Sequence, residues 1–228
     1  MKGLLILFGI GLTVAAYTLS RALATRYASP FTTPVFFSTA LVILVLRILG
    51  LRFDDYEPAK NIIVWLLGPA TVGLAVPLYK NRRTLVRHAL SACVGLVVGS
   101  LSTLVAAVIL ARVFALSETI LSSISIKSVT APIAIELATI INANPTLTTV
   151  FVIATGMIGA MFGPWLMNIS GIYDPLARGL ALGTIAHGQG TAQAVIEGEL
   201  QGAAAGVAMG LAAVFTSCIA PFLVPFLV

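Results

Sequence analysis

Long apolar runs separated by short polar connections make up the first half of the chain. The hydrocarbon core of a bilayer is about 30 Å thick, so a helix that crosses it needs about 20 predominantly apolar residues. Backbone polar groups left unsatisfied in hydrocarbon cost several kcal/mol each, so such runs are expected to be helical throughout. The four runs that fit cover residues 3–20, 34–51, 61–79 and 88–112. We expect the first to stay in the protein as a helix, because Arg21 lies where the cleavage region of a signal peptide would be uncharged.

The next segment breaks this pattern, because polar residues interrupt it. Residues 117–128 are rich in serine, and residues 129–141 are apolar but contain Pro132 and Glu136. The apolar part is too short to span comfortably, and irregular backbone is tolerated at membrane depth only where protein or a water-filled cavity covers it. The pattern therefore predicts a re-entrant or broken helix.

The last third contains one continuous run and one interrupted run. Residues 146–167 form a full span, whereas the apolar segment 175–186 ends at a glycine-rich break over 187–190. A semi-polar continuation then leads into the apolar run 200–228. The break divides a segment that would otherwise span the membrane.

These segments predict an all-α integral membrane protein, a polytopic bundle of about seven to eight transmembrane segments with broken or re-entrant helices. We expect one transmembrane domain over 1–228, with 34–112 and 146–228 as repeat halves, since each holds a span, an interrupted segment and a second span. If 117–141 leaves on the face where it enters, the halves have opposite topology, as in many secondary transporters. If it crosses, the halves are parallel.

Composition supports a membrane protein. Hydrophobic residues make up 59% of the 228 residues and charged residues only 9%, against about 25% charged residues in soluble domains. So few charges cannot solvate the surface of a globule. The net charge of +5 does not indicate nucleic acid, because no basic stripe is interleaved with aromatic residues.

The distribution of Lys and Arg orients the chain. Six basic residues, four of them in the connection 80–87, lie on one side of the first four runs, against three on the other. Cytoplasmic loops carry the excess of Lys and Arg. We therefore expect residues 80–87 in the cytoplasm and the N-terminus outside.

Two prolines and two glycines fall inside the third run, over residues 68–77. Each proline removes a helix hydrogen bond and clashes with the carbonyl four residues earlier. One interpretation is a kinked helix. The other is an unwound segment near the middle of the membrane whose freed backbone groups face a substrate, which would place Pro69 and Thr71 at a binding site.

A cation, two hydroxyls, a helix-start proline and a carboxylate occur within ten residues. They are Lys127, Ser128, Thr130, Pro132 and Glu136. Ser128 or Thr130 as an N-cap, with Pro132 in the first turn, fits the start of a helix. The positive end of that helix suits a carboxylate, with Lys127 attracting it at the entrance. Alternatively, Lys127 reaches the membrane interface and Glu136 is a buried, paired structural group.

The break after residue 186 carries a histidine between small residues. Gly188, Gly190 and Thr191 follow His187. Glycines within a span weaken the helix unless the backbone must bend or a ligand must approach closely. Histidine has an unperturbed pKa in the physiological range, so we expect these residues to bind substrate and His187 to couple transport to protons, with Glu136 as a second titrating group. The alternative is a core histidine with satisfied hydrogen bonds.

Other features indicate packing. Gly202, Gly206 and Gly210 recur every fourth residue, which lets another helix approach closely. Cys93 and Cys218 lie in apolar stretches, where a packing role is expected. The sequence contains no nucleophile–base arrangement, phosphate loop or metal-ligand cluster, so we expect no enzyme activity, metal or cofactor.

The chain resembles the LrgB family, also called the CidB/LrgB family, at the three interrupted stretches. These are bacterial membrane proteins with a relative fused into the plant plastid glycolate/glycerate transporter. The most specific stretches are 68–79, 127–136 and 187–191, and the resemblance covers nearly the whole chain. Family members commonly have proline before the lysine and serine before the histidine, where this chain has Ile126 and Ala186.

The resemblance implies two competing functions. One is transport of small 2-hydroxy or 2-oxo monocarboxylates such as glycolate, glycerate or pyruvate in the bacterial cytoplasmic membrane, with a small LrgA/CidA-type membrane partner or as a homo-oligomer. The other is an antiholin- or holin-like modulator of murein hydrolase export and autolysis. The polar interruptions favour transport, because a lesion-forming protein needs amphipathic, oligomerising helices. A third alternative is a scaffold for a partner subunit.

The charge asymmetry predicts that a cysteine placed at Arg83 is protected from an impermeant thiol reagent in intact cells, whereas one at Asp55 is labelled. The measurement is the extent of labelling before and after the cells are permeabilised. Labelling at both positions to the same extent in intact cells would invert the topology.

Overall fold

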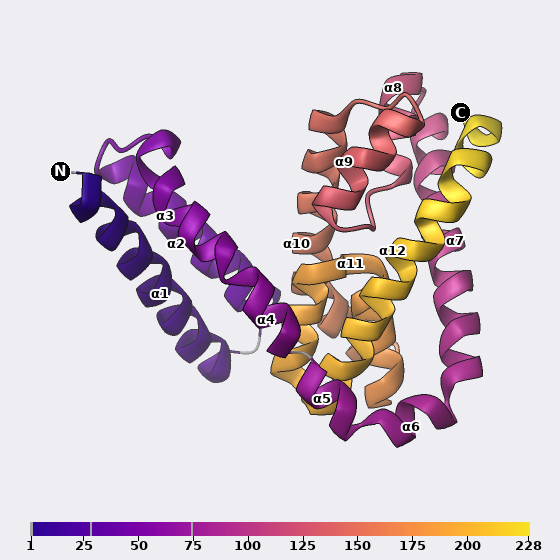
Figure 1. Ribbon diagram of the computed structural model, residues 1–228, viewed down its shortest axis with the longest axis horizontal. Helices are drawn as coiled ribbons and strands as arrows, with labels where there is room; N and C mark the ends of the chain where they lie inside the picture. Colours follow the sequence, from indigo (N-terminus) through magenta and orange to yellow (C-terminus); the bar gives the residue numbers. More distant parts are fainter. Residues whose placement is uncertain (1, 28, 74) are drawn as a thin grey trace. The chain divides into compact units, whose positions relative to one another are not determined.

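The computed structural model describes residues 2–27, 29–73 and 75–228, and every regular element in these residues is helical (Figure 1). The chain divides into two compact units, Met1–Val76 and Pro77–Val228. The first unit contains α1 (Lys2–Arg26), the 3-10 helix η1 (Pro30–Thr32), α2 (Pro34–Ile48), α3 (Phe53–Trp65) and α4 (Leu67–Gly73), and the division falls within α5 (Ala75–Lys80). The second unit contains α6 (Arg82–Arg87), α7 (Ala89–Val113), α8 (Glu118–Ser125), α9 (Ala131–Ile140), α10 (Pro145–Ile169), α11 (Pro175–Glu197) and α12 (Glu199–Leu227).

Five stretches in the described residues are long and apolar enough to cross a membrane. They are Gly3–Arg26, Phe53–Lys80, Ala89–Val113, Pro145–Ile169 and Glu199–Leu227. The predicted all-helical membrane fold is confirmed, but the predicted number of segments is not, because it counted the interrupted stretches as spans.

In the first unit, α1 packs against both α2 and α3. Gly9 allows the close approach to α3, since a Cβ at this position would lie 2.6 Å from Cβ of Ala59. One turn further along α1, the hydroxyls of Thr13 and Tyr56 form a hydrogen bond of 2.8 Å. These contacts hold three helices together with small residues and one polar pair.

The predicted unwound segment at 68–77 is largely helical. Pro69 and Thr71 lie within α4, and the interruption between α3 and α4 is at Leu66, before this stretch begins. Leu74 and the side chain of Thr71 lie outside the described residues. The interpretation as an unwound segment is therefore wrong for Pro69, because a proline near the start of a short helix costs little when its missing N–H would have no helical partner.

In the second unit, α8 and α9 form a hairpin between two long helices. Leu121 of α8 packs near the end of α7 with Val108 and Ala111. Further along the hairpin, Nζ of Lys127 donates a hydrogen bond of 2.8 Å to Oγ1 of Thr103, which lies deeper in α7. The chain then returns through α9, and the backbone N–H of Asn144 donates to Oγ of Ser123 in α8 at 3.2 Å.

Neither half of this hairpin can cross a bilayer by itself. The 8 residues of α8 and the 10 residues of α9 correspond to about 12 and 15 Å of helix, half the hydrocarbon thickness or less. The chain therefore turns back within the second unit as a hairpin of two short helices.

Helix α11 also reverses direction, at His187. This residue has φ 40° and ψ −126°, outside helical geometry, and a Cβ at Gly190 would clash with the carbonyl oxygen of Leu182. The side chains of Arg178 and Glu197 form an ion pair of 2.8 Å, although in a straight helix these residues would lie about 28 Å apart. The predicted break at 187–190 is thus the tip of a second helical hairpin.

Small residues let this hairpin pack against α12. A Cβ at Gly179 or Gly183 would collide with the backbone of Gln201 or Ala205. Ala204 and Ala205 lie at this contact, and most of the other buried residues of α12 are also alanines, namely Ala203, Ala208, Ala212, Ala213 and Ala220. Close packing of small residues substitutes here for the hydrophobic effect, which provides no driving force between helices in lipid.

The predicted packing face Gly202, Gly206 and Gly210 is only partly correct. Gly202 is buried and lies close to Val195. Gly206 is half-buried, whereas Gly210 is exposed, and a Cβ added to Gly210 would meet nothing within 4 Å. The reason is that the glycines needed for close approach are on α11, and alanines suffice on α12.

Replacing Gly183 by alanine should destabilise the protein by about 1–3 kcal/mol, because the added Cβ meets backbone atoms of α12 that cannot move aside. The measurement is the free energy of unfolding of the purified protein in detergent. Gly95→Ala in α7 is the matched control, since a Cβ there meets nothing within 4 Å. Equal stability of the two variants would contradict this packing.

Candidate functional site

The tip of the α11 hairpin is built around the buried imidazole of His187. Its Nε2 lies 3.1 Å from the carbonyl oxygen of Val152 in α10. A carbonyl oxygen only accepts hydrogen bonds, so Nε2 carries the proton and Nδ1 holds the lone pair of the neutral ring. Nδ1 has no hydrogen-bond partner in the described part of the chain. The hydroxyl of Thr191 donates to the carbonyl of His187 at 2.8 Å and so fixes the turn.

Glycines of α10 allow the tip to lie directly against this helix. A Cβ at Gly156 would lie 2.6 Å from both Cε1 of His187 and Oε1 of Gln189. A Cβ at Gly159 would be equally close to Cβ of Ala186. The imidazole and the carboxamide of Gln189 are therefore neighbours in a space that any larger residue at 156 would fill.

Packing contacts that the sequence alone does not show explain why glycine occurs at the tip. Gly190 lies against the first half of the hairpin, where a side chain would collide with Leu182 and Ala186. Gly188 is exposed, and a Cβ there would approach only the sulfur of Met209, at 4.0 Å. Of the two, Gly188 leaves its surroundings open to a ligand, whereas Gly190 is needed for the reversal itself.

The tip of the α8–α9 hairpin presents an ammonium group with two hydroxyls. Nζ of Lys127 donates to Thr103 at 2.8 Å and to Ser128 at 3.3 Å, and the two hydroxyls are 3.4 Å apart. No carboxylate pairs with Lys127 in the described residues. Intramembrane ionisable groups face the bundle interior or a water-filled cavity and mark sites of function. Lys127 lies at the tip of this hairpin, hydrogen-bonded to Thr103 and Ser128.

The helix start after Lys127 is as expected, but its cap is not. Thr130 has the extended backbone of an N-cap residue and Pro132 lies in the first turn of α9, yet the Thr130 side chain makes no capping hydrogen bond. Its hydroxyl is thus not used by the helix. The N-terminal amides of α9 lack that partner as well.

Glu136 does not join the other residues of its motif. Ala134, Leu137 and Ala138 face the core of the second unit, whereas Glu136 is exposed on the opposite face of α9. No described residue forms an ion pair with it. The interpretation of Glu136 as a buried, paired group is wrong, because its position on the helix turns it outward. Its expected role in substrate binding has no support in this arrangement and stays a prediction.

The two hairpin tips meet at one part of α10. Ile126 and Val129, on either side of Lys127, share a buried cluster with Val152, whose carbonyl accepts the bond from His187. The second and third motifs therefore converge although about sixty residues separate them in the sequence. The first motif, with Pro69 and Thr71, lies in the other unit.

A groove leads toward this region between α7 and the first half of α11. Its volume is about 560 Å³, within the range of small-molecule sites. His88 and Asp174 line one end, and Gly99 and Thr184 line the other. Thr184 precedes His187 by one helical turn, so the groove runs along the hairpin toward its tip.

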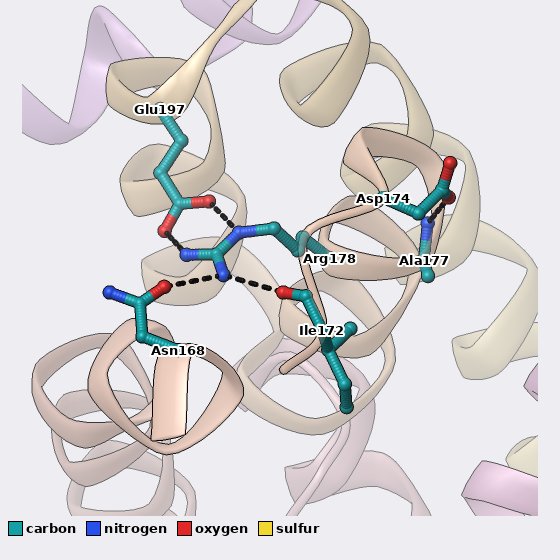
Figure 2. A network of polar contacts seen from close by, with 6 residues as sticks. All are labelled: Asn168, Ile172, Asp174, Ala177, Arg178 and Glu197. Atoms are coloured by element: carbon teal, nitrogen blue, oxygen red, sulfur yellow. Dashed lines mark hydrogen bonds and ion pairs between the residues drawn. The ribbon is translucent and has the colours of Figure 1, made fainter. Parts of the chain in front are cut away.

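Sequence reasoning missed an ion-pair network that closes the base of the α11 hairpin (Figure 2). The guanidinium of Arg178 donates two hydrogen bonds of 2.8 Å to the carboxylate of Glu197. It also donates to Oδ1 of Asn168 at 2.8 Å and to the carbonyl of Ile172 at 2.9 Å. A signal existed, since Arg178 and Glu197 are opposite charges nine residues before and ten residues after His187. A hairpin centred on the histidine would bring them together.

Arg178→Gln should destabilise the protein by about 3–5 kcal/mol, because it leaves the mostly buried carboxylate of Glu197 without its partner. The readout is the denaturation midpoint in detergent. Lys80→Gln is the control, since the Lys80–Glu199 pair is more than half exposed and such pairs are worth about 0–1 kcal/mol. A loss no larger than that of the control would show that the ion pair does not hold the hairpin.

Comparisons with known proteins agree with this architecture. The profile of the LrgB-like family matches residues 13–226. The chain is similar to YxaC of Bacillus subtilis (strain 168), with 36% identity over 82% of each chain, and to YwbG of the same organism, with 33% identity over 80% of this chain and 81% of the relative. It is also similar to the holin-like protein CidB of Staphylococcus aureus (strain Mu50 / ATCC 700699), with 29% identity over 81% of this chain and 80% of the relative. No solved structure matches the chain. With its profile matched over nearly the full length, the chain belongs to the LrgB-like family.

Proposed function

We propose that the chain is a secondary transporter of small 2-hydroxy or 2-oxo monocarboxylates, of the glycolate, glycerate or pyruvate type, coupled to protons. The observation that carries the proposal is the unpaired ammonium of Lys127, held by two hydroxyls beside the buried His187 where two re-entrant hairpins meet. A cation without a carboxylate partner inside a bundle is suited to an anionic ligand. The hydroxyls of Thr103, Ser128 and Thr130 supply further donors.

The arrangement favours reversible binding. The ammonium of Lys127 is already hydrogen-bonded to Thr103 and Ser128, so an arriving carboxylate replaces or shares existing bonds. Its net gain is therefore smaller than that of an anion meeting a bare buried cation. Transport requires such a balance, because the site must bind its substrate and then release it.

His187 supplies the coupling to protons. Nε2 already donates to Val152, so the proton that the neutral ring gains must go to Nδ1. The protonated ring would add a second positive charge near the anion. It would release its proton on the less acidic side of the membrane. Glu136, exposed on the outer face of α9, has no place in this scheme.

The hairpins themselves support transport. A long helix followed by a hairpin occurs twice in the second unit, as α7 with α8–α9 and as α10 with α11. Because α10 returns across the unit, the two hairpins enter from opposite ends, the plan of inverted-repeat transporters with discontinuous helices. Under this proposal the repeats are 89–140 and 145–197, in place of 34–112 and 146–228.

The second candidate is a holin-like or antiholin-like modulator of murein hydrolase export and autolysis. Curated relatives named holin-like protein CidB favour it, and in that respect the comparisons support this candidate better than transport. We further propose that the chain lies in the bacterial cytoplasmic membrane with its N-terminus outside, as the distribution of Lys and Arg predicts. Both candidate functions are compatible with a homo-oligomer or with a small LrgA/CidA-type membrane partner.

His187→Gln should leave weak uptake but remove its dependence on a proton gradient, since glutamine keeps a polar side chain and cannot titrate near neutral pH. The measurement is accumulation of labelled glycolate, glycerate and pyruvate in proteoliposomes with and without a pH gradient. His88→Gln changes the second of the two histidines, at the far end of the groove from the tip, and should keep the dependence of uptake on the proton gradient whatever its rate.

Two outcomes count against the proposal. Gradient-driven accumulation by the His187→Gln variant at the parental level would show that His187 does not couple uptake to protons. No uptake by the parental protein, together with altered murein hydrolase release from expressing cells, would favour the holin-like candidate.

A further inference from the structure

Four buried polar atoms in the described residues have no hydrogen-bond partner. They are Oγ of Ser100, Oγ1 of Thr148, Oε1 of Gln189 and Oε1 of Gln193. Buried polar side-chain atoms almost always have a partner, which is either protein or ordered water. Two of these atoms occur together, because Gln189 and Gln193 both lie on the second half of the α11 hairpin.

These two glutamines belong to one polar face. Gln189, Gln193 and Glu197 are four residues apart, so they project from the same side of the helix. At one end, Gln189 lies beside His187 against Gly156. At the other end, Glu197 pairs with Arg178 at the base of the hairpin (Figure 2). The face thus joins the tip to the base over about 12 Å of helix.

Gln193 is the midpoint of this face and is only 8% exposed. Its neighbour Ala194 is fully buried but packs in an apolar cluster with Met167, Leu182 and Ala205. The adjacent residues 193 and 194 therefore have different surroundings. Ala194 makes apolar contacts, whereas Oε1 of Gln193 has no hydrogen-bond partner in the described residues. An apolar side chain would have suited position 193 if this face were dry.

We propose that Gln189 and Gln193 hold a file of internal water molecules that connects His187 to the base of the hairpin. Each Oε1 would accept a hydrogen bond from a water molecule, and buried waters typically make two to four such bonds to polar groups. The ligand class is water. The file itself is independent of the proposed function, whereas its use by His187 rests on that function.

The file would carry protons without a net movement of water. The water next to His187 donates a proton to Nδ1 and receives one from the water behind it, and so on to the solvent at the base. Each molecule gains and loses one proton, so the sum is one proton transferred from solvent to His187. The reverse sequence returns it.

The charged groups around this route are few in the described residues. Lys127 lies on the linker between α8 and α9, whose Ile126 and Val129 share a buried cluster with Val152, and Arg178 and Glu197 lie at the base. The neighbouring helices α10 and α12 contribute Val152, Gly156 and Ala205 to the contacts of the tip, and none of these titrates. His187 is therefore the titratable group at the inner end of the file.

Cysteine labelling tests the water directly. Gln193→Cys and its control Ala194→Cys are compared in a chain in which Cys93 and Cys218 are replaced by serine, with a small methanethiosulfonate reagent. Such reagents react with the thiolate, which needs water, so we expect modification at 193 to be at least about tenfold faster than at 194. Equal protection at both positions would overturn the water file.

Proton flux tests the use of the file and does not depend on the cysteine variant. Gln193→Leu should slow gradient-driven uptake several-fold while exchange of labelled for unlabelled substrate stays near the parental rate, and Gln193→Asn should restore part of the loss. An unchanged gradient dependence in Gln193→Leu would overturn the proton route. If the parental protein shows no uptake, the proposed function fails, and the labelling at 193 still decides whether water is present.

Discussion

The reversal of α11 at His187 is the constraint on which the rest of the second unit depends. A helix that ran on through this point would separate Arg178 from Glu197 by most of the membrane thickness, and both charges would need other partners. Because the chain turns back, the two charges meet in a bidentate ion pair. The guanidinium of Arg178 also donates hydrogen bonds to Asn168 and to the carbonyl of Ile172. The same turn buries the imidazole and directs it at α10.

A hairpin inside a bundle must be covered on all sides, since no water is available in hydrocarbon to satisfy its irregular backbone. Small residues provide this cover. Gly156, Gly159 and Gly163 let α10 approach the hairpin, and Gly179 and Gly183 let it approach the alanine face of α12. The tip of the α8–α9 hairpin is covered in a different way, by larger apolar side chains such as Ile126, Val129 and Leu137 around Val152.

The convergence of the two tips links the packing to chemistry. Each tip delivers a group that can carry charge, Lys127 from one and His187 from the other, to a place where hydroxyls and glutamine oxygens are the remaining polar groups. That combination suits a small anion and a proton better than it suits a structural role alone, because a purely structural pair would include the carboxylate that is missing beside Lys127.

The sequence by itself determined the helical membrane class and two of the three places where it predicted that helices break, within 117–141 and at 187–190. Both follow from local chemistry, since apolar length decides whether a segment can span, and a histidine among glycines or a proline after Thr130 decides where a helix stops or starts. It could not determine the direction of the chain after each break. That direction makes 117–141 a hairpin, pairs Arg178 with Glu197, turns Glu136 outward and leaves Gly210 without a neighbour. These outcomes depend on contacts between residues far apart in the sequence, which no local pattern encodes, and only the tertiary structure decided them.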